Sequence, residues 1–198
     1  MCPAFFSGLA CNGREYEDYL DEISNFLLAL FLHVFPEIGY ASDDNEPRLI
    51  NQVNYPVALT TSGQPTEAEL ALIAESDYGR VIFLAFNNHQ KAVANEDTIV
   101  TNLGLQFIHI PVEWESPRLD DFESFAAVMQ TSERGRTLVH CEVNYRASVF
   151  GFLYQVIYEG VDVDDAMSMM QSIWVPNDTW QAFIGRVIDE KGLAFPAF

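Results

Sequence analysis

The sequence is short of basic residues. Its 198 residues include 10 lysines and arginines against 29 aspartates and glutamates, which gives a formal net charge of −19. A surface of this charge repels nucleic acids and anionic lipid headgroups, so we expect no nucleic-acid partner. The same field slows the approach of a phosphorylated substrate. Any phosphate site must therefore gather its few cationic side chains and its backbone N–H groups in one place.

The sequence also has few cysteines and no long apolar segment. Cys2, Cys11 and Cys141 are too few and too unevenly spaced for a disulfide framework, and they form no metal-ligand pattern with the four histidines. We therefore expect a reducing, cytoplasmic location and neither a metal nor another cofactor. No cationic stretch precedes the apolar residues near the N-terminus, so we expect no export signal. The apolar run 26–35 is shorter than the roughly 20 residues of a membrane-spanning helix, so we expect no membrane span.

The residues that are present fit one folded domain with an appendage. Hydrophobic residues make up 49% of the sequence, which is typical of a globular protein. Residues 15–35 have helical apolar spacing, and their second half is apolar on every side. This pattern predicts a helix buried against the main domain or against a second copy of the chain. With the polar linker 41–47, we predict an extension over 1–47, a main domain over 48–198 and a possible homodimer through the helix.

The main domain alternates the patterns of strands and helices. The unbroken apolar run 81–85 predicts a strand that is buried on both faces. Further strands are predicted at 105–112 and 137–140. Helical spacing predicts helices at 93–102, after Pro117, around 149–157, at 162–172 and at 178–190. Residues 61–67 predict a turn into a further helix, where Thr66 and Glu69 form a capping box. This alternation indicates an α/β fold with a mainly parallel sheet flanked by helices.

Cys141 lies where a predicted strand ends and a helix begins. In open α/β sheets, ligands bind beyond the carboxyl ends of the strands, and anions are held by the N–H groups of a helix N-terminus. The positive end of a helix also favours the thiolate form of a cysteine, which is the nucleophilic form. The sequence therefore indicates an anion site with a reactive cysteine. The alternative is a buried, inert thiol, because free cysteines are often buried.

The residues around Cys141 read His140-Cys141-Glu142-Val143-Asn144-Tyr145-Arg146-Ala147-Ser148. This loop resembles that of the cysteine-dependent phosphatases of the protein tyrosine phosphatase type, which reads His-Cys, five residues, Arg, then Ser or Thr. Here four residues separate Cys141 from Arg146, and Ala147 stands where the family has its arginine. Residues 50–188 are more closely similar to small bacterial tyrosine-phosphatase-like proteins, in which the shorter spacing looks native. The shared motifs are Gly-Gln-Pro-Thr at 63–66, Ile-Pro-Val at 110–112, His-Cys at 140–141, Asn-Tyr-Arg at 144–146 and Ile-Trp-x-Pro at 173–176.

The resemblance implies a cysteine-phosphatase-like fold and a role for each loop residue. Cys141 would attack phosphorus to form a phosphocysteine, which water then hydrolyses. His140 would orient the loop, and the Ser148 hydroxyl would stabilise the Cys141 thiolate as a leaving group. The expected partner is a phosphorylated protein or small molecule. The residues implied in binding its phosphate are Glu142, Val143, Asn144, Tyr145, Arg146 and Ala147.

The family mechanism also needs a general acid to protonate the leaving oxygen. The family supplies an aspartate from the loop after the preceding strand, and here that loop is 113–117. Glu113 stands nearest to the place of the family acid, and Glu115 is the second choice. Glutamate is one methylene longer than aspartate, which moves the proton by about the 1 Å that matters in catalysis. Either carboxylate is also typical of a solvated surface acid.

Other conspicuous residues are predicted to have structural roles. His89 and Lys91 follow a strand and are expected in an exposed loop, although they could border the pocket. His33 and His109 are expected to be hydrogen-bonded histidines rather than metal ligands. The residues expected to pack around the site are Trp174, Pro176 and Trp180.

Three functions remain open from the sequence. The first is a cysteine-dependent phosphatase that hydrolyses phosphomonoesters without a metal. The second is a catalytically weak or inactive module that binds phosphate or a phosphoprotein, because the bidentate contact of Arg146 depends on a geometry that one residue can spoil. The third is a sulfur-handling enzyme of the rhodanese type, which also places a reactive cysteine between a strand and a helix. The order of cysteine, arginine and serine favours the first.

Overall fold

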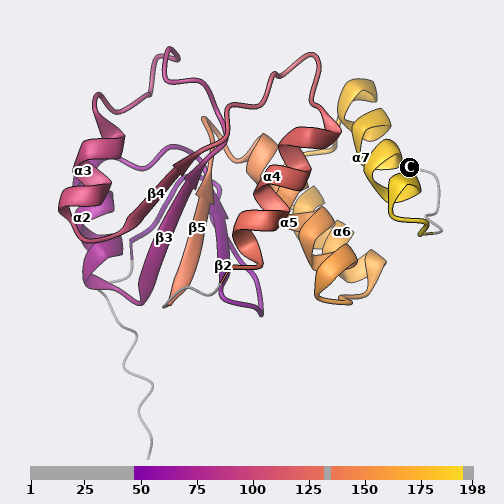
Figure 1. Ribbon diagram of the computed structural model, residues 1–198, viewed down its shortest axis with the longest axis horizontal. Helices are drawn as coiled ribbons and strands as arrows, with labels where there is room; N and C mark the ends of the chain where they lie inside the picture. The colour runs from indigo at the N-terminus through magenta and orange to yellow at the C-terminus, as the bar shows by residue number, and fades with distance from the viewer. Residues whose placement is uncertain (1–46, 132–134, 194–198) are drawn as a thin grey trace, which may run out of the picture. The chain divides into compact units, whose positions relative to one another are not determined.

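The computed structural model describes residues 47–131 and 135–193. Five strands form one sheet in the order β1-β2-β5-β3-β4 (Figure 1). They are β1 (Val53–Asn54), β2 (Leu59–Ser62), β3 (Tyr78–Phe83), β4 (Gln106–His109) and β5 (Arg136–His140). Strands β2, β5, β3 and β4 are parallel, and the short β1 runs antiparallel to β2. The predicted α/β fold with a mainly parallel sheet is confirmed.

Helices cover both faces of this sheet. They are α2 (Glu67–Glu75), α3 (Glu96–Asn102), α4 (Leu119–Met129), α5 (Tyr145–Tyr158), α6 (Val163–Gln171) and α7 (Asp178–Glu190). Helices α2 and α3 lie on the side of one face, and α4, α5, α6 and α7 lie on the side of the other (Figure 1). The order of elements along the chain therefore produces a layer of strands between two layers of helices.

The apolar runs in the strands are explained by burial of both faces of the sheet. Along β3, Val81 belongs to the apolar cluster that includes residues of α2 and α3, whereas Ile82 belongs to the cluster that includes residues of α5 and α7. Leu138 and Val139 alternate in the same way along β5. Successive side chains of a strand point to opposite faces, so a strand covered on both sides needs apolar residues at every position.

Several boundaries differ from the predictions. Strand β2 includes residues predicted as the start of a turn, because its Leu-Thr-Thr-Ser sequence is polar although all four residues are buried. Helix α3 begins at Glu96 rather than at 93, since Asn95 has a left-handed φ of 56°. Strand β4 ends at His109, well before the predicted 112. The capping box of Thr66 and Glu69 is confirmed.

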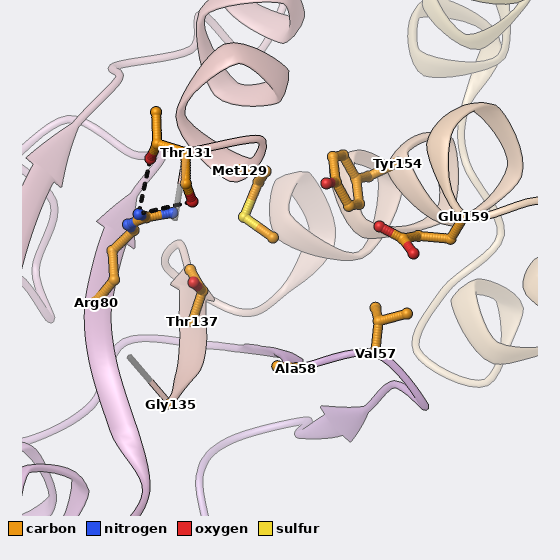
Figure 2. Close-up of a pocket in the computed structure, with 9 residues that line it drawn as sticks. All are labelled: Val57, Ala58, Arg80, Met129, Thr131, Gly135, Thr137, Tyr154 and Glu159. Carbon is orange, nitrogen blue, oxygen red and sulfur yellow. Dashed lines mark hydrogen bonds between the residues drawn. The ribbon is translucent and has the colours of Figure 1, made fainter. Parts of the chain in front are cut away.

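A polar cluster surrounds Arg80 near the start of β3. Arg80 is 1% exposed and pairs in register with Thr137 of β5. Its guanidinium donates to the Gln106 side chain at 2.7 Å, to the Val128 carbonyl at 2.9 Å and to the Thr131 hydroxyl at 2.9 Å. A cavity of about 160 Å³ lies beside these groups, and Figure 2 shows Arg80 and Thr131 at its edge.

Some predictions concern residues outside the described part of the chain. The helix over 15–35, with His33 and the homodimer contact, lies there, as does the linker 41–47 except for its last residue. Within residues 47–131 and 135–193, none of the helices combines the length and the hydropathy needed to cross a bilayer.

Candidate active site

Cys141 follows β5 directly, at the carboxyl ends of the parallel strands. Its N–H donates to the Ser62 carbonyl at 3.2 Å, and the carbonyl of His140 accepts the Leu84 N–H at 2.9 Å. Cys141 is therefore anchored between the ends of β2 and β3, at the place that the sequence predicts. It is a free thiol with an exposed fraction of 0%, so solvent does not reach it in this conformation. Burial alone does not distinguish a reactive cysteine from an inert thiol. The residues around Cys141 must therefore be compared with what each alternative requires.

Asn144 turns the chain from this loop into α5. Its φ of 74° is left-handed, a region that asparagine enters more readily than most residues. The Asn144 amide donates to the carbonyl of Asn51, and the Asn51 amide donates to the carbonyl of Val143 at 3.0 Å. This exchange holds the turn in place. Because N–H groups in the first turn of a helix lack intrahelical partners, those of Tyr145 and Arg146 can serve an anion.

A second segment approaches the loop at Gly63. The Gly63 N–H donates to the Ile50 carbonyl at 2.7 Å, and the Gln64 N–H donates to the Glu142 carbonyl at 3.2 Å. A Cβ atom at Gly63 would lie 3.0 Å from the Ile50 Cβ and 3.1 Å from the Glu142 oxygen. Glycine is therefore required for this close approach of two backbones, which gives the motif at 63–66 a physical reason.

His140 is held against a buried carboxylate that was not predicted. Its Nε2 lies 3.0 Å from Glu96 Oε1, with side-chain exposures of 0% and 5%. The two atoms are within ion-pair distance, but they are not aligned as a hydrogen bond. Gln64 donates to the other Glu96 oxygen at 3.0 Å, and the His140 ring stacks on Phe83 with centroids 4.7 Å apart. Because these contacts fix the ring, His140 can position the loop that follows it.

Arg146 reaches toward the loop after β4. Its Nε donates to the Val112 carbonyl at 3.0 Å, and its guanidinium carbon lies 5.2 Å from the centroid of the Trp114 ring. Within the described residues, its terminal nitrogens make no hydrogen bond. A phosphate that approaches Arg146 as it stands therefore meets one edge of the guanidinium, while Nε is already occupied. Four residues separate Cys141 from Arg146, one fewer than in the tyrosine phosphatase loop, and here the Arg146 Nε donates to a backbone carbonyl.

Ser148 is engaged away from the thiol. Its hydroxyl donates to the Tyr145 carbonyl at 3.0 Å and accepts the Trp174 indole N–H at 3.1 Å. The hydroxyl proton is therefore directed along α5 in this conformation. The contact with Cys141 that the resemblance implies requires a rotation of this side chain.

The loop after β4 is fixed through its backbone, whereas its two glutamates are free. Glu113 and Glu115 are exposed and make no hydrogen bond or ion pair with the described residues. Between them, the Trp114 carbonyl accepts the Trp180 indole N–H at 3.1 Å. With the bond from Arg146 to Val112, this contact pins the loop on both sides of Glu113. Its carboxylate is thus exposed to solvent on a fixed backbone.

Aromatic rings pack beside the phosphate loop. Tyr145 stacks on Trp174 with centroids 4.6 Å apart, and Trp114 lies 5.5 Å from Trp174 and 5.3 Å from Trp180. Trp180 is fully buried. The predicted packing role of Trp174 and Trp180 is confirmed, and the cluster joins α5, α7 and the loop after β4.

His89 lies closer to the site than its predicted exposed loop suggests. It is half-buried, and its ring packs on Phe83 with centroids 6.1 Å apart. Burial lowers the pKa of His89; Glu142 acts in the opposite direction, while His140 and Arg146 lower it further. Charges of the phosphate loop therefore act on this histidine. The sequence hinted at this position only through its place after a strand.

Two further features lie near the site, a second histidine and a cavity. His109, predicted as hydrogen-bonded, contacts the Ala85 carbonyl through Nε2 at 2.7 Å. In the part of the chain that the structure describes, no three potential metal-binding side chains come together. A cavity of about 380 Å³ lies beside Glu96 and is bounded by Asn87 and Asn95 from the ends of the His89 loop.

Comparison with known proteins agrees with this geometry. Residues 30–177 match the family described as a DSP-PTPase phosphatase fused to NAD+ kinase. No curated protein matches the sequence. A candidate phosphatase (DUF442) from Shewanella putrefaciens CN-32 is 29% identical over 74% of this chain and 97% of that chain, with a TM-score of 0.67. A second structure under the same name is 30% identical over 72% of this chain and 91% of that chain, with a TM-score of 0.63.

A more distant structure shares the fold. TpbA from P. aeruginosa, solved in complex with pTyr, is 19% identical over 72% of this chain and 88% of that chain, with a TM-score of 0.58. The family match covers well over half of the 198 residues, so the resemblance to cysteine phosphatases is confirmed for fold and family. The chain belongs to the PTP-NADK family of DSP-PTPase phosphatases.

Proposed function

We propose that this protein hydrolyses phosphomonoesters through a phosphocysteine on Cys141. The observation that carries the proposal is the place of Cys141, between the end of a buried parallel strand and the first turn of α5, with Arg146 on that same turn. This is the arrangement in which helix N–H groups and a guanidinium can hold a phosphate beside a thiolate.

Two displacement steps account for the reaction. In the first, the Cys141 sulfur attacks phosphorus, the bond to the leaving oxygen breaks, and Glu113 protonates that oxygen. Loop N–H groups and Arg146 stabilise the negative charge on the other phosphate oxygens. In the second, water attacks phosphorus while Glu113 accepts its proton, and the P–S bond breaks to regenerate the thiolate. The products are an alcohol or phenol and inorganic phosphate.

The site must rearrange for this reaction. Cys141 is fully covered, the Arg146 Nε is bonded to Val112, and the Ser148 hydroxyl is bonded to Tyr145. A phosphate dianion offers several strong acceptors, so it can compete for these donors on binding. A covered site of this kind does not slow the reaction once the phosphate has entered. Exclusion of water strengthens each electrostatic contact between the site and the phosphate.

The same observations favour a second candidate, a module that binds phosphate without turnover. Arg146 that remains on Val112 would present one edge to a phosphate, and Cys141 that remains covered would not attack it. Phosphate would then be held by the N–H groups of the first turn of α5 and by one edge of Arg146. The two candidates share a binding site and differ only in the covalent step.

The deciding experiment compares three full-length proteins. The wild type is expected to hydrolyse p-nitrophenyl phosphate between pH 5 and 7 with an excess of chelator present, and Cys141→Ser is expected to lose all turnover. Cys11→Ser is the matched control, because it removes a thiol that the proposal does not use. Calorimetry with inorganic phosphate is run on each protein. Phosphate binding without turnover in the wild type identifies the second candidate, and equal turnover in Cys141→Ser rejects the phosphocysteine.

A further inference from the structure

His89 has a ring nitrogen without a partner at the edge of the phosphate loop. The Nε2 atom is shielded from solvent and makes no hydrogen bond with any described residue. A shielded polar atom without a partner costs free energy, so its retention calls for a reason. The other ring nitrogen has a partner, since Nδ1 accepts the Lys91 N–H at 3.2 Å. This bond fixes the ring relative to its own loop.

The hydrogen of the neutral ring is therefore on Nε2. Because Nδ1 acts as an acceptor, the only tautomer of a neutral imidazole that fits carries its proton on the other nitrogen. Burial, His140 and Arg146 lower the pKa of His89 against the opposing effect of Glu142 and Glu96, which favours the neutral ring at neutral pH. Nε2 is thus an N–H donor that lacks an acceptor among residues 47–131 and 135–193.

The surroundings of His89 indicate the acceptor. Glu142 and Arg146 belong to the phosphate loop, and His140 immediately precedes it, and all three act electrostatically on the His89 ring. The ring also packs on Phe83, the residue on which His140 stacks. His89 and His140 therefore share Phe83 as a packing partner, which brings the His89 ring beside the strand end from which the loop starts.

The loop itself is short of one donor. Arg146 uses Nε on the Val112 carbonyl at 3.0 Å, so it cannot offer a phosphate the paired Nε and terminal N–H groups while that bond persists. A tetrahedral oxyanion held by the first turn of α5 and by one edge of Arg146 has an oxygen left for a further N–H group.

We propose that His89 completes the phosphate site by donating its Nε2–H to a non-bridging oxygen of the substrate phosphate. This inference rests on the phosphate site of the proposed function, but it does not require the covalent step. It makes His89 a binding residue for phosphate monoesters and inorganic phosphate, and it assigns the loop between β3 and α3 to the active site.

The experiment measures inorganic phosphate binding to the full-length protein by calorimetry. His89→Ala is expected to weaken binding by about 10- to 100-fold, the range for a lost hydrogen bond to a charged group. His89→Gln is expected to recover most of the affinity, since its amide can place an N–H near the position of Nε2. Lys91→Gln is the matched control for loss of positive charge from the same loop, and it is expected to bind phosphate within about twofold of the wild type, because an exposed charge contributes little.

A spectroscopic readout separates a phosphate contact from a structural role. Phosphate is expected to shift the Nε2 and Hε2 NMR signals of His89 in the wild type, which a ring that only supports the loop would not show. The inference is overturned if His89→Ala binds phosphate as the wild type does, if these signals do not move, or if the wild type binds no phosphate. Phosphate binding that depends on His89 without any turnover leaves this inference standing and rejects only the proposed catalysis. Thermal unfolding of each variant confirms that it is folded.

Discussion

The two ends of the sheet each hold an arginine, and the structure uses the two differently. At the amino end, Arg80 is 1% exposed, and its guanidinium donates to Gln106, Val128 and Thr131 beside the cavity in Figure 2. At the carboxyl end, Arg146 is half-buried and, among the described residues, donates only to the Val112 carbonyl.

This difference separates an arginine that holds the fold from one that can hold a ligand. A buried charge is stable only when protein groups satisfy its donors, and Arg80 has such a set. Arg146 keeps its terminal nitrogens unbonded by the described residues and rests its guanidinium over Trp114. The two ends therefore predict opposite results when the arginine is removed, one in stability and the other in activity.

Removing Arg146 is expected to have the largest effect on activity. Arg146→Ala should lower kcat/KM for p-nitrophenyl phosphate by about 10²- to 10³-fold, as expected for the loss of a group that stabilises transition-state charge. The melting temperature should change little, because the side chain is half-buried and makes one hydrogen bond. Arg146→Lys keeps the positive charge but not the forked guanidinium, so its kcat/KM should lie between those of the wild type and Arg146→Ala. A large loss of stability with activity retained would reverse the comparison.

Removing Arg80 is expected to act on stability. Arg80→Met should lower the free energy of unfolding by about 3 kcal/mol, since the Val128 carbonyl and the Gln106 and Thr131 side chains lose a buried donor. Urea denaturation followed by tryptophan fluorescence measures this change. At a temperature where the variant is folded, kcat should stay close to that of the wild type. A variant with normal stability and lost turnover would place Arg80 in the function instead.

A contrast between apolar and polar buried strands explains which parts of the fold the sequence could predict. The centres of strands β3 and β5 were predictable because both faces of the sheet are buried there and apolar residues follow one another, as Val81 and Ile82 do in β3 and Leu138 and Val139 do in β5. Strand β2 was missed, because its threonines and serine form no apolar run although all four residues are buried. The Thr60 hydroxyl, for example, donates to the Asn54 side chain at 2.9 Å. A sequence pattern records which residues are apolar, but it does not record which polar residues find partners on folding.

The sequence indicated where the candidate site lies, but not which residues its loop contacts. Cys141 was located from the strand-loop-helix pattern, whereas His140 and Arg146 were singled out by the resemblance to the phosphatase loop. In the structure His140 ends β5, Cys141 follows it, and Arg146 lies in the first turn of α5. The partners of the loop were not located, because Asn51 is 93 residues from Asn144 and Glu96 lies on another helix. The direction of Arg146 also depends on the Val112 carbonyl, and no feature of the loop sequence specifies that contact.

The general acid provides a third test at the carboxyl end. Glu113→Gln should lower kcat by about 10²-fold for phenyl phosphate, the lower end of the usual contribution of acid catalysis. The effect should be smaller for p-nitrophenyl phosphate, because p-nitrophenolate leaves without much help from a proton. Glu115→Gln is the matched control, with the same charge change two residues away, and should be near wild type. Equal losses in both variants would indicate a general charge effect on the loop rather than proton donation.

The smallest expected effect concerns the turn that connects the loop to α5. Asn144→Gly keeps the left-handed conformation but removes the hydrogen bond to the Asn51 carbonyl, and it should lower the free energy of unfolding by about 1 kcal/mol. Asn144→Ala removes the same bond and adds left-handed strain, for a total loss of about 2 kcal/mol. Urea denaturation of the pair isolates the cost of φ = 74° at this residue. Equal losses would mean that the turn relaxes away from that conformation. The first turn of α5 would then be free to reorient, and phosphate affinity should fall in both variants together.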